Sequence, residues 1–375
     1  MKKHIRKFTA AAVLSVMVIA AASSFMMNDS KVSFSENRRL ADFPKLSASS
    51  VYSGRSTEEA EKYAADHLAM RDKMLSFRTK LTKKFGGGTV NDVYIGKDRL
   101  LDAEISQRPA DQTLADRINA FARSYNGTLY IAVIPTSSGI YGEEMPAHLL
   151  KFPEGQQISS LYDSLDTDIR RIDAYNLLKM LKENYIYFRT DTKWTSYGAY
   201  CIYRTVIQKL GFLPVTYDMY TIRHVANNFR GSLYNRCLCT DTMADMLDIY
   251  EYPDGAQVQS CMAMDKNGIS HEINFYDMDM LESSYMYNMY MGAPEAVVQI
   301  ETDVNNQRKL LIIKDSYADC FIPFLTQHYS QITVISPQYL DGELSDYVDL
   351  SGYEQTLMLF GIENAGDTQL MNGLL

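Results

Sequence analysis

The fold of this sequence is decided by the stretch Leu310-Leu311-Ile312-Ile313-Lys314-Asp315-Ser316-Tyr317-Ala318-Asp319. Four consecutive apolar residues before a polar turn are typical of a strand that is covered on both faces, as in a parallel sheet. We expect Leu310–Lys314 to form that strand and a helix to follow it. Ser316 would then lie just after the carboxyl end of the strand, which is where α/β sheets place their ligands.

The same alternation of strand and helix recurs along the rest of the chain. Further strands are predicted at Leu129–Ile134, Ile332–Ile335 and Thr356–Phe360. Helices are predicted at Ala110–Tyr125, Thr195–Leu210, Tyr317–Tyr329 and Leu340–Tyr353, one or two further helices at Leu161–Glu183, and a short hairpin at Val90–Leu101. Alternating units of this kind predict an α/β domain with a doubly wound, mostly parallel sheet.

The beginning of the chain has the pattern of an export signal. Four basic residues within positions 2–7 precede an uncharged, mostly apolar run over residues 8–27. Residues 1–27 are therefore predicted to be a signal peptide, cleaved after Ala22, or a retained signal anchor. Residues 28–56 are expected to form an extended lead, and residues 57–375 a single α/β domain that begins with a helical segment, Thr57–Phe85. In either case the body of the protein is expected outside the cytoplasm of a bacterium, secreted or anchored to the outer face of the cytoplasmic membrane.

Composition excludes several classes of protein. The chain has 375 residues, of which 46% are hydrophobic and 22% charged, so disordered, collagen-like and disulfide-stapled miniproteins are excluded. Its net charge is −9. A chain this acidic is not expected to bind nucleic acid.

The cysteines do not predict a disulfide framework or a metal site. There are five, an odd number, at Cys201, Cys237, Cys239, Cys261 and Cys320. Cys237 and Cys239 could be combined with nearby histidines into a zinc site, but the spacing matches no established zinc pattern. Buried packing is the favoured interpretation. We predict no metal and no cofactor.

Two segments contain the candidate catalytic residues. Ser316 could expose its hydroxyl as a nucleophile; alternatively, with Asp319 three residues later, it could be a helix cap. The stretch 187–199 contains the only Trp of the chain. If this stretch is extended, Asp191 and Lys193 project on the same side, as a catalytic pair or as a surface ion pair.

Several segments, in their order, resemble the DHHW family of bacterial exported proteins, which is related to the AlgX/AlgJ-type proteins that acetylate exopolysaccharide. The segments are Ser35–Leu40, Asp66–Arg71, Asn91–Lys97, Val133–Pro135, Arg189–Thr195, Phe229–Tyr234, Lys314–Ala318 and Pro323–Ser330. The resemblance implies an SGNH-hydrolase-like, flavodoxin-like three-layer sandwich, permuted so that the Ser block lies near the C-terminus. It also implies a Ser-His-Asp triad that passes an acetyl group through an acyl-enzyme to a sugar hydroxyl or to water.

Carried over onto this chain, the resemblance gives Ser316 as the nucleophile and Asp191 as the acid that orients the base. Residues expected to contact the substrate are Trp194, Asp315, Tyr317 and Gly292. Both histidines of the family's Asp-His-His-Trp are replaced here, by Thr192 and Lys193. A lysine with an ordinary pKa of about 10.4 is protonated at neutral pH and cannot accept a proton from Ser316. Lys193 could act as the base only if desolvation lowered its pKa, and Asp191 beside it has the opposite effect.

Two hypotheses about function follow. In the first, the protein is an envelope O-acetyltransferase or esterase that acts on a cell-surface polysaccharide through Ser316. In the second, the fold is kept without turnover, as a glycan-binding or scaffolding protein. The Tyr- and Met-rich segment 285–291 could line a glycan groove, although packing is favoured, and His328 is also expected to pack rather than to replace the missing base.

Overall fold

The computed structural model describes residues 32–33, 38–43, 49, 52–67, 71–85, 88–103, 112–265, 268–366 and 373. The chain divides into two compact units, residues 1–91 with 234–241, and residues 92–233 with 242–375. The predicted leader 1–27 lies outside the described residues, as does most of the predicted lead 28–56. Within the described ranges, no helix is both long and apolar enough to cross a membrane.

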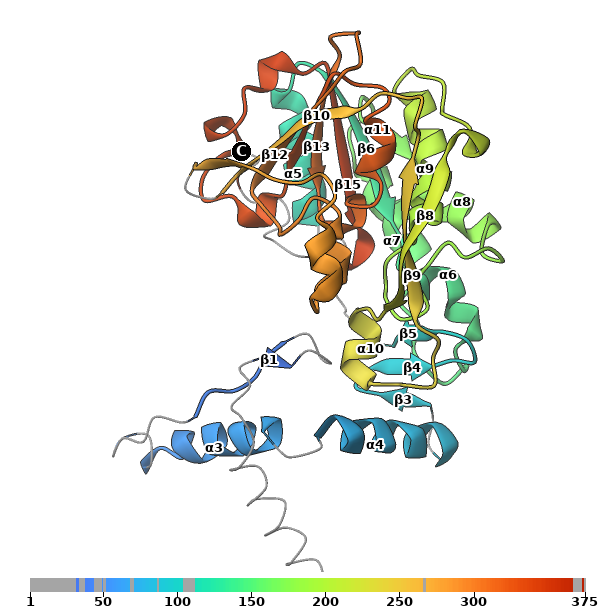
Figure 1. Ribbon diagram of the computed structural model, residues 1–375, viewed down its shortest axis with the longest axis vertical. Coiled ribbons are helices and arrows are strands. Elements are labelled where there is room, and N and C mark those ends of the chain that lie inside the picture. The colour runs from blue at the N-terminus through green and yellow to red at the C-terminus, as the bar shows by residue number, and fades with distance from the viewer. Residues whose placement is uncertain are drawn as a thin grey trace, which may run out of the picture. The chain divides into compact units, whose positions relative to one another are not determined.

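The second unit is built on one sheet of eight strands in the order β11-β10-β12-β14-β13-β15-β6-β7 (Figure 1). The strands are β6 (Thr128–Ile134), β7 (Arg170–Ile172), β10 (Val258–Met264), β11 (Ser270–Glu272), β12 (Val297–Thr302), β13 (Lys309–Lys314), β14 (Gln331–Ile335) and β15 (Gln355–Gly361). Strands β14, β13, β15, β6 and β7 run parallel to one another. Strands β12, β10 and β11 add an antiparallel edge beside β14. The predicted α/β class is confirmed, and the sheet is mixed and largely parallel.

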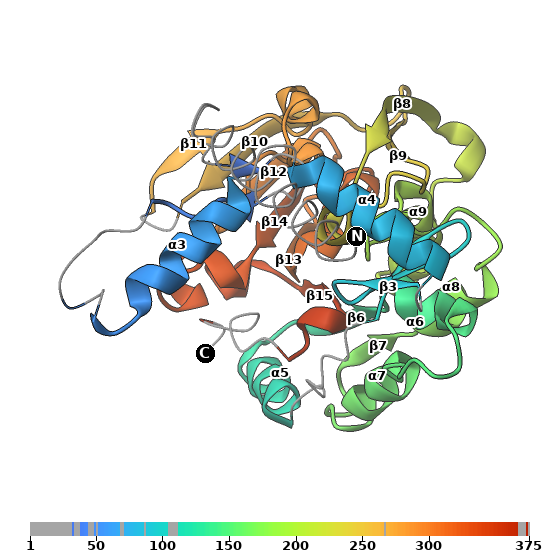
Figure 2. The same cartoon turned by 90° about the horizontal axis from the view of Figure 1, so that it is seen from below.

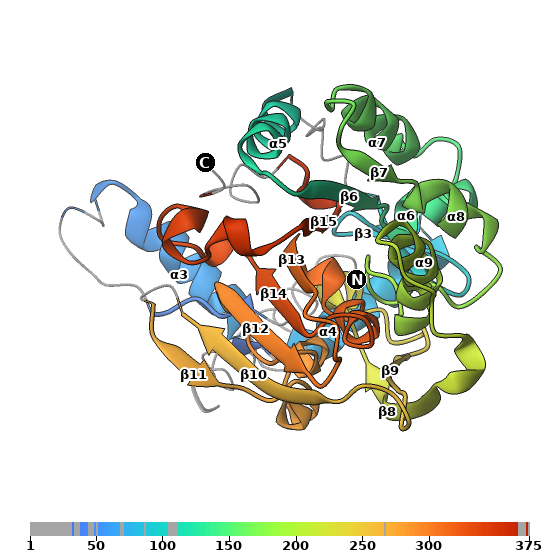
Figure 3. The ribbon, with the colours of Figure 1, turned by 90° about the horizontal axis from the view of Figure 1, so that it is seen from above.

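Helices cover both faces of this sheet, because its central strands are apolar on both sides. Leu311 and Ile313 of β13 pack in one buried cluster with α5 (Gln112–Ser124) and α7 (Glu154–Asp163). Leu310 and Ile312 point to the other face, which is covered by α6 (Ser137–Tyr141), α8 (Ala174–Met180) and α9 (Ser196–Lys209). Figure 3 shows α5 and α7 on the opposite side of the sheet from α9.

Two pairs of antiparallel strands flank the sheet within the second unit. They are the predicted hairpin, β4 (Val93–Ile95) with β5 (Leu100–Asp102), and a ribbon of β8 (Thr221–Phe229) with β9 (Asp245–Glu251). The helical segment predicted at 57–85 falls in the first unit and forms two helices, α3 (Arg55–Asp66) and α4 (Arg71–Phe85) (Figure 2). The first unit also contains β1 (Val32–Ser33), β2 (Arg38–Arg39) and β3 (Thr89–Val90). Helix α10 (Ser232–Cys237) begins at the end of one unit and continues into the other.

Three predicted helices were wrong in extent. The segment 317–329 contains only the 3-10 turn η5 (Ser316–Ala318) and the short helix α11 (Ile322–Leu325), which begins at a Pro-containing turn. The segment 340–353 forms the 3-10 turns η7 (Leu344–Asp346) and η8 (Leu350–Gly352), because its Asp, Ser and Gly residues favour turns over helix. The segment 161–183, predicted as one or two helices, contains only the end of α7, then β7, and then the whole of α8.

Candidate active site

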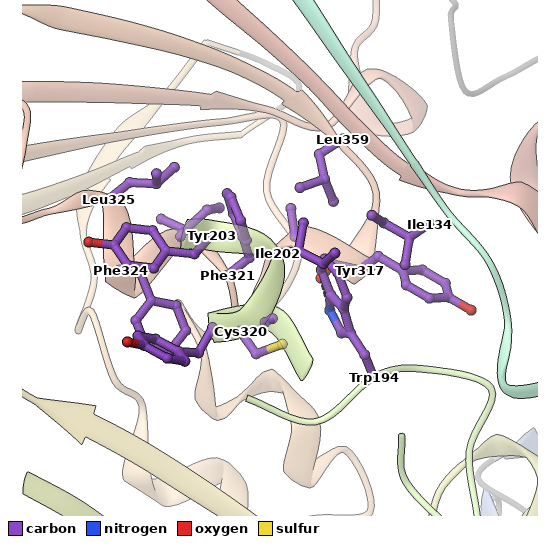
Figure 4. Close-up of a cluster of buried hydrophobic side chains, with 14 of the residues drawn as sticks. Ile134, Trp194, Ile202, Tyr203, Tyr317, Cys320, Phe321, Phe324, Leu325 and Leu359 are labelled. Carbon is purple, nitrogen blue, oxygen red and sulfur yellow. Dashed lines mark hydrogen bonds between the residues drawn. The ribbon is translucent and has the colours of Figure 1, made fainter. Parts of the chain in front are cut away.

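The segment around Asp191 and the segment around Ser316 meet at the carboxyl end of β13. The indole Nε1 of Trp194 donates a hydrogen bond of 2.8 Å to the carbonyl of Tyr317. The hydroxyl of Tyr317 donates in return to the carbonyl of Thr192, at 3.2 Å. Trp194 also stacks on Phe321, with 6.2 Å between ring centroids, inside the buried cluster of Figure 4. The two candidate segments, more than a hundred residues apart in sequence, therefore form one site.

Ser316 lies at the first position of η5, directly after β13, and is half-buried. The residue that caps η5 is Asp315, whose carboxylate accepts a 2.9 Å hydrogen bond from the backbone N–H of Tyr317. Asp319, the other member of the expected capping arrangement, instead pairs with Lys314 at 2.5 Å. The capping interpretation of Ser316 was therefore wrong. In the part of the chain that the structure describes, the Ser316 hydroxyl makes no hydrogen bond, so it is available to a ligand.

Asp191 is buried and fixed in place by backbone donors. Its carboxylate accepts hydrogen bonds from the backbone N–H of Ser232, at 2.7 Å, and of Lys193, at 3.0 Å. A Cβ added to Gly231 would lie 2.2 Å from Oδ2 of Asp191, so only glycine allows this close approach. Residues 191–193 form a bend rather than the extended stretch that was expected. The bend nevertheless brings the Lys193 Nζ to 3.7 Å from the Asp191 carboxylate.

Lys193, the residue expected at the position of the base, lies in surroundings that favour its charged form. Its side chain is 18% exposed, and Nζ lies 5.6 Å and 5.8 Å from the ring centroids of Tyr287 and Tyr317. Burial by itself lowers the pKa of Lys193. Four carboxylates outweigh burial and raise the pKa above its ordinary value; they are Asp191, Glu363, Asp315 and Asp319. The side chain is therefore an ammonium at neutral pH and donates hydrogen bonds rather than accepting a proton.

Glu363 belongs to the same site and was missed in the sequence. It lies in η9 (Ile362–Asn364), directly after β15, and its carboxylate accepts a 3.2 Å hydrogen bond from the Thr192 hydroxyl. The residue as a whole is exposed, but the protein surrounds its carboxylate. Desolvation, together with the nearby carboxylates of Asp191, Asp315 and Glu154, raises the pKa of Glu363 to about 7 against the lowering effect of Lys193. The signal that could have found it is its place just after a predicted strand, at the edge where Ser316 lies.

The residues predicted to contact the substrate occupy different environments. Trp194, Asp315 and Tyr317 are buried, so in this structure they support the site from within. Gly292 lies in the turn before β12, where its φ of +76° suits glycine. Among the described residues, no hydrogen bond joins Gly292 to the Ser316 segment. Substrate contact by these four residues stays a prediction.

His328 packs in the interior, as the sequence analysis favoured. It makes the free energy of unfolding depend on pH. Its Nε2 lies 2.7 Å from the Tyr203 hydroxyl, and burial lowers its pKa to about 4. As the pH falls from about 6.5 towards 4, the unfolded chain binds this proton first, so the free energy of unfolding decreases by about 2 to 3 kcal/mol. Urea unfolding at pH 7 and pH 4.5 should show a smaller decrease for His328→Gln than for the wild type. An equal decrease in His328→Gln and in the wild type would contradict the assignment of this pH dependence to His328. His271→Gln is the matched control, because His271 is half-exposed.

The cysteines form no disulfide, and four of the five are buried. Burial raises the pKa of Cys237, Cys261 and Cys320 to about 12. These thiols are therefore protonated and unreactive at neutral pH, in agreement with the predicted packing role.

Comparison with known proteins relates this arrangement to a family. A family model described as "DHHW protein" matches residues 87–335. A DHHW family protein from Eubacterium siraeum has a crystal structure with a TM-score of 0.61 and 20% identity, covering 76% of this chain and 95% of that one. The structure of Bacillus cereus PatB1 with a sulfonyl adduct has a TM-score of 0.60 and 17% identity, covering 73% and 95%. These two structures share their fold with this chain.

One curated relative matches by sequence over a shorter stretch. It is the "Probable alginate O-acetylase AlgJ" of Azotobacter vinelandii, which is 31% identical over 132 residues. The match covers 32% of this chain and 32% of the relative, so this chain spans about a third of the relative's length.

Proposed function

This chain belongs to the DHHW family, and we propose on that premise that it binds an O-acetylated polysaccharide of the bacterial cell envelope without transferring the acetyl group at neutral pH. The binding site is the rim that contains Ser316, Asp191 and Lys193. The polysaccharide class is supported by the sequence match to a probable alginate O-acetylase. The location, outside the cytoplasmic membrane, is supported by the basic and apolar pattern of residues 1–27.

The raised pKa of Lys193 is the observation that carries this proposal. Acyl transfer through a serine needs a base that is unprotonated at the working pH and takes the hydroxyl proton. With four carboxylates acting on it, Lys193 keeps its own proton, and Ser316 stays a weakly nucleophilic alcohol. The ammonium and the Ser316 hydroxyl are instead suited to donate hydrogen bonds to an acetyl carbonyl or to a carboxylate of a sugar.

A second candidate function, acetyl transfer or ester hydrolysis, is favoured by the Ser316 geometry. The hydroxyl follows β13 at the ligand-binding edge of the sheet and makes no hydrogen bond within the described residues. In that function the Ser316 oxygen attacks the acetyl carbonyl while its proton passes to a base, and the base returns the proton to the ester oxygen that leaves. Water or a sugar hydroxyl then takes the acetyl group from Ser316 and restores its hydroxyl. Glu363 supplies a carboxylate at the same edge, with a pKa of about 7 that suits a base near neutral pH.

Covalent labelling separates the two functions. The related PatB1 structure contains a sulfonyl adduct, so a sulfonyl fluoride is the natural probe. At pH 7 we expect no sulfonyl group on Ser316 by intact mass. We also expect acetylated alginate oligosaccharides to bind better than de-O-acetylated ones, with an affinity that Ser316→Ala lowers by about two- to tenfold, as the loss of one hydrogen bond would. One sulfonyl group per chain at pH 7, absent from Ser316→Ala, would instead establish the enzyme; failure to bind any acetylated polysaccharide would contradict the binding function.

A further inference from the structure

We propose that helix α4 binds an anionic membrane surface, with an exposed apolar row placed among the lipid headgroups. The row consists of Met74, Phe77, Leu81 and Phe85, which are 56%, 62%, 43% and 77% exposed. Their spacings of three and four residues put them on one face of α4, within an arc of about 80°. A continuous row of large apolar side chains exceeds the scattered exposure that is ordinary for a soluble surface.

The charge of α4 is opposite to that of the chain as a whole. The helix contains six basic residues and one acidic residue, a net charge of +5 in a chain of net charge −9. The helical repeat places Lys73, Lys80 and Lys84 on one side of the apolar row, and Arg71 and Arg78 on the other. Two of these five pair with acidic residues of the same unit: Lys80 with Asp241 at 3.5 Å and Arg71 with Asp66 at 3.9 Å. An apolar row between basic side chains is the arrangement found in helices that lie in the interface of anionic membranes.

The opposite face of α4 is already occupied within its own unit. Thr79, about 150° around the helix from the centre of the apolar row, is buried and donates a 2.5 Å hydrogen bond to the carbonyl of Cys237. Ser76 Oγ lies 3.3 Å from the Thr240 hydroxyl. These contacts orient the helix on residues 234–241. Met74, Leu81 and Phe85 are thereby directed away from the packed side of α4. Phe77, at the edge of the row, also borders a cavity that α4 forms with Tyr234, Leu238 and Thr240.

The chemistry of the row favours a lipid surface over other occupants. An anionic polysaccharide could bind the basic side chains but would leave the apolar row in water. A second copy of the chain would bring two helices of net charge +5 together, which is repulsive. The predicted leader, residues 1–27, would also hold α4 close to a membrane whenever it is retained as an anchor.

Photo-crosslinking in the full chain tests whether α4 itself contacts lipid. It does so whether or not the leader is inserted in the membrane. The variants Phe77→p-benzoylphenylalanine and Phe85→p-benzoylphenylalanine are irradiated with vesicles of phosphatidylcholine and phosphatidylglycerol. Leu213→p-benzoylphenylalanine is the matched control, because Leu213 is 87% exposed in the other unit. We expect about tenfold more lipid adduct at positions 77 and 85 than at 213, with a marked loss in pure phosphatidylcholine or at high salt.

Several outcomes would overturn the proposal. Equal lipid adducts at all three positions would show that proximity to the vesicle, not α4, determines labelling. Adducts to a second copy of the chain would make the row a protein interface. Suppression of labelling by soluble alginate, with no lipid adduct, would make α4 a polysaccharide site. As a second readout, Lys73→Gln with Lys84→Gln should reduce the lipid adduct at position 77 at least severalfold while leaving the melting temperature unchanged.

Discussion

Lys193→His should give the protein an acetyl-esterase activity at pH 7.5 that exceeds the wild-type activity by about 100-fold or more. A positioned general base contributes about 10²- to 10⁴-fold to such reactions. An imidazole at position 193 would have Asp191 as its charged neighbour, as in a Ser-His-Asp arrangement. Its ordinary pKa of about 6.5 lies about four units below that of lysine, so it can lose its proton near this pH even though the same carboxylates raise its pKa. Lys193, whose pKa its four neighbouring carboxylates raise, cannot accept the Ser316 proton there.

The activity is measured with a chromogenic acetyl ester and with acetylated alginate. The double variant Lys193→His, Ser316→Ala is the control and should return to the background rate. Lys193→Arg keeps the charge and should be as inactive as the wild type. A wild type as active as Lys193→His at pH 7.5 would contradict the claim that the native site lacks a working base. If Glu363→Gln then abolished that wild-type activity, Glu363 would be the base.

Asp315→Ala should lower the free energy of unfolding by about 3 to 5 kcal/mol, the largest stability effect expected of one residue in the site. The Asp315 side chain joins the ends of β13 and β15. It accepts hydrogen bonds from the backbone N–H of Tyr317 at 2.9 Å and of Gly361 at 2.7 Å, and from the Asn364 side chain at 2.7 Å. Asp315 is only 2% exposed, and removing its side chain leaves all three donors without this acceptor; the two backbone donors are buried, whereas Asn364 is half-buried. Urea denaturation measures the loss.

Asp349 provides the matched control for this prediction. It caps η8 as Asp315 caps η5, accepting a 3.0 Å hydrogen bond from the backbone N–H of Ser351, but it lies in solvent. Asp349→Ala should therefore change stability little, since water replaces the lost acceptor. Equal losses in the two variants would show that Asp315 acts only as a helix cap and does not hold the two strand ends together.

Four of the five parallel strands could be predicted from the sequence because each carries its own signal; β7, which is only three residues long, lies in a segment that was predicted to be helical. Strands β6, β13, β14 and β15 are continuous apolar runs, and their predicted bounds lie within a residue or two of those observed. Strand β10 was not predicted, because its partly exposed residues include Gln259 and Ser260 and lack a continuous apolar run. The 285–291 segment was correctly assigned to packing at Met289, Tyr290 and Met291, which are buried.

The chemistry of the site was less predictable, because it depends on contacts between distant segments. The neighbour Asp191 indicated that Lys193 would be charged, but the contribution of Glu363 depends on β15 lying next to β13. The choice between Asp315 and Ser316 as the cap depends on where η5 begins, which the residue types alone leave open. Sequence reasoning thus identified the two segments that meet at the site. The structure was needed to show which carboxylates surround Lys193 and raise its pKa.

The most direct test of the account is the pKa of Lys193 itself. In protein labelled with ¹³C at lysine Cε, the Lys193 resonance is identified by its absence from Lys193→Arg and is followed by NMR as the pH is raised. The account predicts a titration above the ordinary lysine value of about 10.4. A Lys193 that loses its proton below about pH 8 would contradict it and would give Ser316 a base under physiological conditions.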